Sequence, residues 1–141
     1  MDGGFFLCPD AWEFLLPAGV RHLRDTGTVC RQRWDLLALT PAGCGLLAGS
    51  SAAAELLLLP GDCRGSGLRA ETVVTYGLSP RDSITLSSLR EPVLCVQRAL
   101  PLLCGGVLEP QEFPLPGLAG GEGLLPCVST RLLWTGSPYP A

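Results

Sequence analysis

The sequence predicts a small single-domain α/β protein (residues 1–141), in which helices flank a partly parallel sheet that carries an antiparallel extension in its second half. Three observations lead to this fold class. Helix and strand patterns mix in the first half of the chain, strand patterns dominate the second half, and 18 glycines and 13 prolines indicate many short elements joined by turns. With 47% hydrophobic residues, the chain is also able to bury one core.

The N-terminal part begins with the apolar run GFFLCP, which predicts a strand ended by proline. The following stretch DAWEFLL predicts a helix start, because Asp10 and Glu13 have the spacing of a capping box. Pro17 interrupts that helix. We expect residues 18–33 to be weakly helical at best, with Gly27 ending or kinking the helix.

The middle of the chain contains the clearest strand patterns. ELLLLPGD is an apolar run closed by a turn and predicts a buried strand. ETVVTYGLS and DSITLSSL are two β-branched runs joined by Ser79, Pro80 and Arg81. WDLLALTP fits either a strand or the end of a helix, because periodicity does not decide for so short a run. AGCGLLAGSSAAA, made of small residues, predicts a strand and turn that lead into a short helix.

The last part, residues 91–141, predicts a strand-rich extension with a loop rich in glycine and proline. PVLCVQRAL and GGVLEPQEFPL continue the β pattern. Glu109 and Glu112 fit a proline-containing edge strand whose charges discourage edge-to-edge pairing. PGLAGGEGLLP predicts the loop, and VSTRLLWTGSPYPA predicts a last short strand before a frayed end.

The charge pattern argues against a nucleic-acid partner. The net charge is −3, and the ten basic residues are scattered, whereas nucleic-acid binding depends on a basic face. The apolar runs are far shorter than the roughly 20 residues that span a bilayer. The N-terminal MDGGFF lacks the basic start of a secretory signal. We therefore expect a cytoplasmic protein that binds neither nucleic acid nor membrane.

No lysine occurs in the chain, and all ten basic residues are arginine. A phosphate-binding loop ending in Gly-Lys-Ser/Thr, a Schiff base and a carbamylated lysine all need this side chain. The sequence therefore excludes these three kinds of chemistry. We expect no cofactor, and no residue pattern identifies a catalytic group or a metal site.

The seven cysteines form neither a metal motif nor a disulfide framework. They include no C-x-x-C pair, and their number is odd. We expect most of them to be reduced, buried and apolar in character. The alternative is one reactive thiol, although no cysteine has a neighbouring histidine in the sequence. The seven are Cys8, Cys30, Cys44, Cys63, Cys95, Cys104 and Cys127.

Two short stretches are candidates for ligand binding. Arg21, His22 and Arg24 place three potential cations close together in RHLRDTGTV, which predicts a small-anion site. The simpler interpretation of His22 is a surface residue near a helix end, where the helix dipole favours it. Thr75 and Tyr76 end a predicted strand, the place where open α/β sheets bind ligands. The simpler interpretation there is a tyrosine that packs at a strand end with its hydroxyl in solvent.

The serines of the middle region offer no convincing nucleophile. A serine nucleophile needs a base within hydrogen-bond reach, only His22 could serve as that base, and the chain has no G-x-S-x-G turn. We expect them on the solvent side of strands and in turns. They are Ser79, Ser83, Ser87 and Ser88.

Three stretches together resemble the ATP-binding central domain of the Mur ligases, the bacterial peptidoglycan amino-acid ligases. RHLRDTGT resembles the family's D-H-L-D-x-x-G-T stretch, and ETVVTYGLSPRDSITLSSL resembles the end of that domain. ELLLLPGD occupies the place of a strand that ends in Asn-x-Asp-Asp, of which only Asp62 matches a member. Arg21 and Arg24 replace the family's two acidic residues. The resemblance covers roughly residues 18–90.

The resemblance implies a shortened domain that has lost ligase chemistry, because the lysines of the family's phosphate loop and carbamylated site are missing. It implies that His22 occupies an inherited ligand position, where the flanking arginines would repel a cation. We therefore expect a non-catalytic module that binds a protein, such as a cell-wall biosynthetic enzyme, or a small anion. The alternatives are an enzyme that uses a cysteine thiolate or a pocket near His22, and a structural homo-oligomer subunit such as a dimer.

Overall fold

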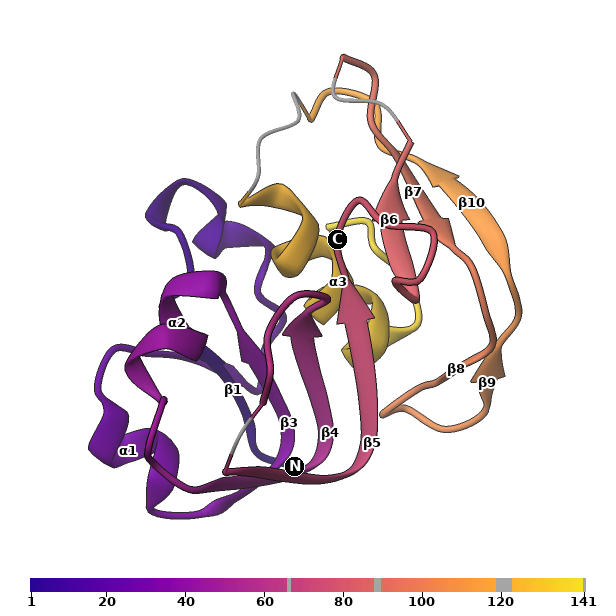
Figure 1. The fold of residues 1–141 in the computed structure, drawn as a ribbon. Coiled ribbons are helices and arrows are strands. Elements are labelled where there is room, and N and C mark those ends of the chain that lie inside the picture. Colours follow the sequence, from indigo (N-terminus) through magenta and orange to yellow (C-terminus); the bar gives the residue numbers. More distant parts are fainter. Residues whose placement is uncertain (66, 88–89, 119–122, 141) are drawn as a thin grey trace.

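A mixed eight-stranded sheet forms the centre of the computed structural model, which describes residues 1–65, 67–87, 90–118 and 123–140 (Figure 1). The order across the sheet is β10-β7-β6-β5-β4-β3-β1-β2. The six strands at one side of this order, β6-β5-β4-β3-β1-β2, all pair in parallel with their neighbours. Strand β7 is antiparallel to both β6 and β10. The predicted α/β class, a partly parallel sheet with an antiparallel extension, is therefore confirmed. The strands of this sheet are β1 (Gly3–Phe6), β2 (Val20–Leu23), β3 (Arg33–Leu39), β4 (Ala52–Pro60), β5 (Leu68–Tyr76), β6 (Ile84–Leu86), β7 (Val93–Val96) and β10 (Gln111–Pro114).

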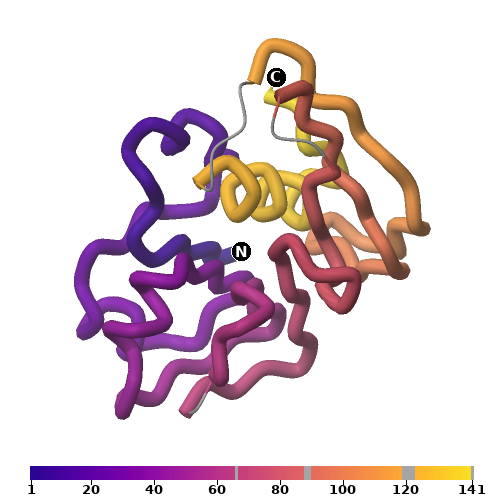
Figure 2. The backbone as a smooth tube through the Cα atoms, turned by 45° about the horizontal axis from the view of Figure 1, so that its top comes forward, coloured from indigo at the N-terminus to yellow at the C-terminus, as the bar shows by residue number. Residues whose placement is uncertain are grey.

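Helices cover both faces of the sheet. The short helices α1 (Thr26–Cys30) and α2 (Pro41–Leu46) lie on one face. The longer α3 (Leu124–Thr135) and the 3₁₀ helix η1 (Asp10–Leu15) lie on the other. Figure 2 shows α3 between the N-terminal segment and the antiparallel strands. A separate two-stranded ribbon pairs β8 (Leu100–Pro101) with β9 (Val107–Leu108).

The central strand β4 explains why the sheet needs cover on both sides. Leu56 and Leu58 belong to the core beneath α3, whereas Leu57 and Leu59 belong to the core beneath α1 and α2. All four side chains are almost completely buried. A strand with parallel neighbours on both sides typically has such a continuous apolar run. The buried strand predicted from ELLLLPGD is confirmed.

The N-terminal part confirms the first strand but corrects the elements after it. The segment after Pro9 is a 3₁₀ helix without a side-chain cap, so the predicted capping box is not formed. The carboxylate of Glu13 instead reaches His22 on a different element. Residues 18–33 are not weakly helical, since they contain the edge strand β2 and the helix α1. Backbone pairing with β1 stabilises β2 as a strand.

In two further segments, a helix lies where the sequence predicted a strand. The small residues after β3 form helix α2 first and strand β4 second, because Thr40 caps the helix and Pro41 begins it. VSTRLLW lies within α3 rather than in a last strand. Gly136 ends α3 with a φ of 88°, a conformation that favours glycine. WDLLALTP, for which strand and helix were both open, is strand β3.

The antiparallel extension agrees with the strand patterns of the second half. The β-branched runs form β5 and β6, which are joined through the turn at residues 79–81 and pair in parallel, so the antiparallel part begins with β7. Glu112 lies in β10, which is the outermost strand on that side of the sheet, as the edge-strand interpretation predicts. The predicted Gly/Pro-rich loop falls partly on residues 119–122, and Ser88 is one of residues 88–89. Both of these stretches lie outside the described residues.

None of the helices in the described part of the chain combines the length and apolar character that crossing a membrane requires.

Candidate functional site

A pocket of about 980 Å³ lies where β1, β3, β4 and β5 end and where α3 begins. Open α/β sheets bind their ligands outside the carboxyl ends of the strands, and small-molecule pockets measure about 300–1,000 Å³. The position and the volume together make this the candidate functional site. We call it the carboxyl-edge pocket. It is lined by residues 7, 9, 40–42, 60–62, 76–79, 81, 82, 86, 123, 125 and 126.

Asp82 lines this pocket, and its carboxylate packs against two glycines. Its carboxylate lies so close to Gly61 and Gly77 that a Cβ atom at either position would clash with it. Oδ2 of Asp82 accepts a hydrogen bond from the backbone N–H of Ser79 at 3.1 Å. The amide of Gln97 donates to the carbonyl oxygen of Asp82 at 2.7 Å. The glycines that follow β4 and β5 therefore make room for a buried carboxylate between two strand ends.

Hydrogen bonds between neighbouring strand ends hold the rest of the rim. The hydroxyl of Tyr76 donates to the carbonyl oxygen of Leu39 at 2.6 Å, and burial raises the pKa of this phenol well above its ordinary value. The hydroxyl of Thr40 accepts from the N–H of Gly43 at 3.1 Å and donates to the carbonyl oxygen of Phe6 at 3.4 Å. The ends of β1, β3 and β5 are thus connected to one another and to the start of α2.

Leu7, the residue directly after β1, has a left-handed backbone conformation with a φ of 61°. Among the described residues it is the one non-glycine position with a positive φ. Leucine rarely adopts this conformation, and such strain concentrates at functional sites. The N–H of Leu7 donates to the carbonyl oxygen of Leu23 at 2.9 Å, and the residue lines the carboxyl-edge pocket. This strain therefore supports a functional role for the pocket.

The charged lining of the pocket is acidic on balance. It consists of Asp62, Asp82 and Arg81. Asp82 is buried, whereas Asp62 and Arg81 are exposed at the edge. Apolar side chains, among them Leu86 and Leu125, form much of the remainder, together with glycines and a few uncharged polar residues. This combination suits a ligand that presents an apolar body and donates hydrogen bonds.

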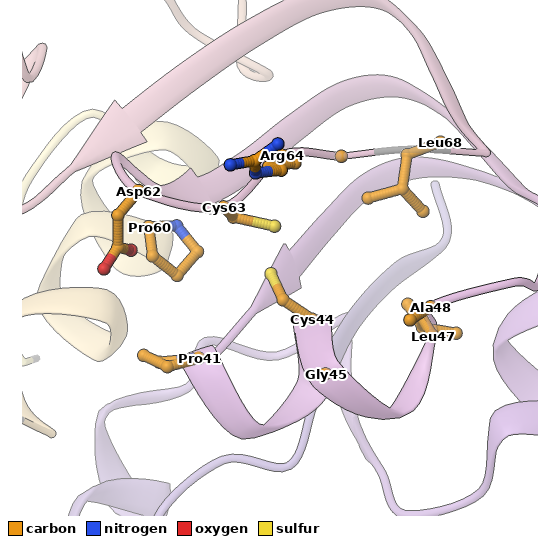
Figure 3. Close-up of a pocket in the computed structure, with 11 residues that line it drawn as sticks. Pro41, Cys44, Gly45, Leu47, Ala48, Pro60, Asp62, Cys63, Arg64 and Leu68 are labelled. Atoms are coloured by element: carbon orange, nitrogen blue, oxygen red, sulfur yellow. The ribbon is translucent and has the colours of Figure 1, made fainter.

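A smaller cavity of about 430 Å³ adjoins the carboxyl-edge pocket and shares Pro41, Pro60 and Asp62 with it. Figure 3 shows Cys44 and Cys63 inside this cavity, with their sulfur atoms directed toward each other. Burial, and then the interaction with the neighbouring Cys63 thiol, raises the pKa of Cys44 far above its ordinary value. Cys44 is therefore protonated at neutral pH.

The predicted anion site separates into two contacts on opposite faces of β2. The guanidinium carbon of Arg21 lies 5.2 Å from the centre of the Trp34 ring, on the α1 face. Nδ1 of His22 lies 3.2 Å from a carboxylate oxygen of Glu13 in η1, on the α3 face. Neighbouring residues of a strand point to opposite faces, so Arg21 and His22 are not brought together. His22 lies in a strand and its side chain is largely buried, so its expected place near a helix end on the surface is wrong.

Asp10, Glu13 and His22 form a three-residue cluster whose potential ligand atoms all lie within 4.8 Å of one another. A guanidinium nitrogen of Arg24 lies 4.0 Å from Asp10 and 3.9 Å from Glu13. The positive charge of Arg24 therefore already occupies the space beside both carboxylates. The arrangement is a mixed ion-pair network, and a metal ion would have to displace the arginine.

The second predicted site is also divided between two faces. Tyr76 lines the carboxyl-edge pocket, but its hydroxyl is buried and bonded to Leu39 rather than open to solvent. Thr75 is the neighbouring residue of β5, and its hydroxyl accepts a hydrogen bond from the N–H of Ser83 at 3.3 Å. Ser83 is buried, contrary to the expectation of a solvent-exposed serine, whereas Ser79 and Ser87 are exposed.

The cysteines differ from the expectation that most are buried. All seven are free thiols, as expected, yet only Cys8 and Cys127 are buried. Cys30 and Cys104 are exposed, and the other three are intermediate. The two sites that sequence reasoning missed are the thiol pair and the buried Asp82. Glycines at two successive strand ends were the available signal for Asp82.

Comparisons with family models, with curated proteins and with solved structures give no match to this chain. The resemblance to the Mur ligases therefore stays a prediction. The geometry of the chain itself is the basis on which its function can be proposed.

Proposed function

We propose that this chain is a small-molecule-binding module whose ligand occupies the carboxyl-edge pocket. The observation that carries the proposal is a pocket of about 980 Å³ at the carboxyl ends of four parallel strands. In sheets of this type that edge is the usual ligand site, because loops from several strands converge there. The positive φ of Leu7 at the same edge supports the same location.

The lining favours a ligand with an apolar body and an amine or hydroxyl group. Leu86 and Leu125 offer apolar surface, and Asp62 offers an exposed carboxylate at the edge of the pocket. An anionic ligand would meet two carboxylates and one guanidinium. A cationic or neutral hydrogen-bond donor is therefore favoured over the small anion expected from RHLRDTGTV.

Binding is favoured over catalysis by the state of the nearby thiol and phenol. Burial raises the pKa of both Cys44 and Tyr76. A nucleophile or general base needs a pKa shifted toward neutrality, and these shifts lead away from it. The hydroxyl of Tyr76 is also committed to Leu39. Neither group therefore has the pKa of a catalytic nucleophile or general base at neutral pH.

The proposal keeps the non-catalytic role that the Mur-ligase resemblance implies, but does not depend on it. If the chain descends from that family, the phosphate chemistry has been lost with the lysines. A cell-wall biosynthetic partner, a dimer and a cytoplasmic location stay predictions. A structural subunit would need no pocket of this size, so ligand binding takes precedence.

Three matched compounds test the proposal by isothermal titration calorimetry. Phenethylamine, phenethyl alcohol and phenylpropionate share an aromatic body and differ in charge. We expect phenethylamine to bind most tightly, phenethyl alcohol less tightly and phenylpropionate weakest. Tightest binding of phenylpropionate would contradict the proposed ligand class. An absence of heat with all three, repeated at millimolar ligand, would contradict the binding module itself.

A charge-neutralising variant identifies the group responsible. Asp62→Asn should weaken phenethylamine binding about twofold to fivefold, the range that an exposed charge pair of ~0.4–1 kcal/mol supplies. It should leave phenethyl alcohol almost unchanged. Glu109→Gln is the matched control, because Glu109 is also exposed but is not among the residues lining the pocket. Equal effects of the two variants would exclude Asp62 as the recognition group.

A further inference from the structure

Cys44 and Cys63 are two thiols from different elements that meet in one cavity. Cys44 lies in α2, and Cys63 lies in the loop that follows β4. Both line the cavity of about 430 Å³, and their sulfur atoms are directed toward each other (Figure 3). The nearby Cys63 thiol is, after burial, a further cause of the raised pKa of Cys44. A covalent bond between the sulfurs would therefore connect groups that the fold already places in one cavity and directs toward each other.

The two thiols are also within reach of small molecules. Both are partly exposed, and the cavity opens beside them. The chain provides an internal comparison in Cys8 and Cys127, whose sulfur atoms lie 3.6 Å apart. That second pair, in which Cys127 belongs to α3, is buried in the core, with exposed fractions of 4% for Cys8 and 0% for Cys127. Proximity is common to both pairs, and access distinguishes them.

The loop that carries Cys63 has the backbone freedom that a bridge requires. Gly61 precedes Cys63, and Gly65 follows it with a φ of 62°. Disulfides need a narrow range of Cα and Cβ separations, so at least one partner must adjust its backbone. The short, half-exposed helix α2 and this glycine-containing loop are both suited to such an adjustment.

We propose that Cys44 and Cys63 form a reversible disulfide by exchange with a small-molecule disulfide, for which glutathione disulfide is the probe. In the first step the Cys63 thiolate attacks one sulfur of glutathione disulfide. A mixed disulfide forms at Cys63, and one glutathione leaves as a thiolate that takes up a proton. In the second step the Cys44 thiol loses its proton to solvent and attacks the Cys63 sulfur, releasing a second glutathione.

The balance of this exchange is complete. Two protein thiols are oxidised to one disulfide, and one glutathione disulfide is reduced to two glutathione molecules. Cys63 attacks first because burial disfavours the thiolate of Cys44. The second attack is intramolecular, so the high effective concentration of Cys44 compensates for its low thiolate fraction.

The bridge would tie α2 to the end of β4 and close the smaller cavity. Asp62, which directly precedes Cys63, is shared by both cavities. Bridging therefore restrains one wall of the carboxyl-edge pocket. The disulfide proposal does not rest on ligand binding there, because the exchange needs only the two thiols and their access to solvent.

The absence of lysine makes the test simple. Trypsin cleaves this chain only after arginine, so Cys44 and Cys63 fall in one peptide, residues 34–64. The protein, with Cys30→Ser and Cys104→Ser removing the exposed single thiols, is equilibrated in glutathione buffers of rising oxidised fraction. Acid quenching, unfolding, alkylation with iodoacetamide and mass spectrometry then report the state of each thiol.

We expect peptide 34–64 to lose both alkylation sites and two hydrogen masses as the buffer becomes oxidising, and to regain them with dithiothreitol. Cys44→Ser should leave a single glutathione adduct on Cys63. Cys8 and Cys127 should stay alkylatable after unfolding. The bridging equilibrium constant should be at least about tenfold larger in the folded protein than in urea, because folding raises the effective concentration of the two thiols.

Three outcomes would overturn the proposal. Peptide 34–64 could stay doubly alkylated throughout the redox series. It could carry two separate glutathione adducts without a bridge. The bridging constant could also be equal in buffer and in urea, which would make the reaction a property of sequence separation rather than of the fold. In any of these cases, calorimetry could still show the expected order of binding of the three phenyl compounds, which would support ligand binding. The disulfide proposal and the binding proposal can therefore be contradicted separately.

Discussion

Asp82 shows how single residues make the candidate site. Its carboxylate occupies the space that side chains at Gly61 and Gly77 would need, and its Oδ2 accepts a hydrogen bond from Ser79. Glycine is required at position 61 because no larger side chain fits there, and not because of backbone conformation, since the φ of Gly61 is not positive. A glycine at this strand end is a packing partner of a buried acid.

Gly61→Ala should destabilise the protein by about 1–3 kcal/mol, because the new methyl group would displace the Asp82 carboxylate. Gly45→Ala is the matched control. Gly45 lies in α2 with open space around the position of a Cβ, so this change should stabilise the protein by about 0.5–1 kcal/mol. Urea unfolding of both variants measures the difference. A neutral Gly61→Ala would show that Asp82 does not fill this space.

Tyr76 makes the stability of the folded protein depend on pH in the alkaline range. Burial raises its pKa in the folded state above the ordinary value of 10.0, so the folded protein holds the phenolic proton more tightly than the unfolded chain does. Stability from this group is complete below pH 10 and is lost as the pH rises toward the folded pKa. The loss should reach about 1.4 kcal/mol per pH unit, because the unfolded chain releases one additional proton.

Tyr76→Phe isolates this effect. The variant should be about 1 kcal/mol less stable at neutral pH, because the hydrogen bond to Leu39 is lost. The difference between variant and wild type should then shrink between pH 10 and pH 11. Urea unfolding of both proteins between pH 10 and pH 11 measures this difference in the free energy of unfolding. Cys44 and Cys127, whose pKa is also raised, are present in both proteins, so their titration does not distinguish wild type from variant. Parallel curves for the two proteins would contradict the buried-phenol account.

At the scale of elements, sequence patterns succeeded where burial on both faces dictates composition. The apolar run of β4 is clear in the sequence because the strand is buried on both faces between two parallel neighbours. The run of β5 is clear for a different reason, since its β-branched residues favour a strand although its burial alternates along the chain. β2 and α3 were predicted wrongly. β2 has only four residues and is a strand through its pairing with β1, and α3 contains β-branched residues yet is a helix that packs across the sheet. In both elements tertiary contacts outweigh local propensity.

The start of α2 supplies a prediction at this scale. Thr40 caps the helix through Gly43 and donates to Phe6 at the end of β1, so one hydroxyl connects two elements. Thr40→Ala should destabilise the protein by about 1–2 kcal/mol. Thr40→Ser keeps the hydroxyl and should recover most of that loss. Thermal unfolding of both variants measures it, and equal melting of the alanine and serine variants would show that the hydroxyl has no capping role.

At the scale of the whole molecule, the candidate site is a product of topology. The carboxyl-edge pocket combines Leu7, Thr40, Tyr76 and Leu125, which lie far apart in the sequence and meet only because parallel strands end at one edge. Tyr76 could be predicted because it ends a clear strand. The other residues could not, since strand order and the position of α3 are not encoded in any local motif.

The most direct measurement of ligand binding at the carboxyl-edge pocket is a map of backbone amide shifts in a ¹H–¹⁵N NMR titration with phenethylamine. We expect the largest shifts on Gly61, Gly77, Ser79 and Gly123, which line this pocket. Largest shifts on residues 21–25, beside the His22–Glu13 contact and the ion pairs of Arg24, would contradict that location and place the ligand at the RHLRDTGTV stretch instead.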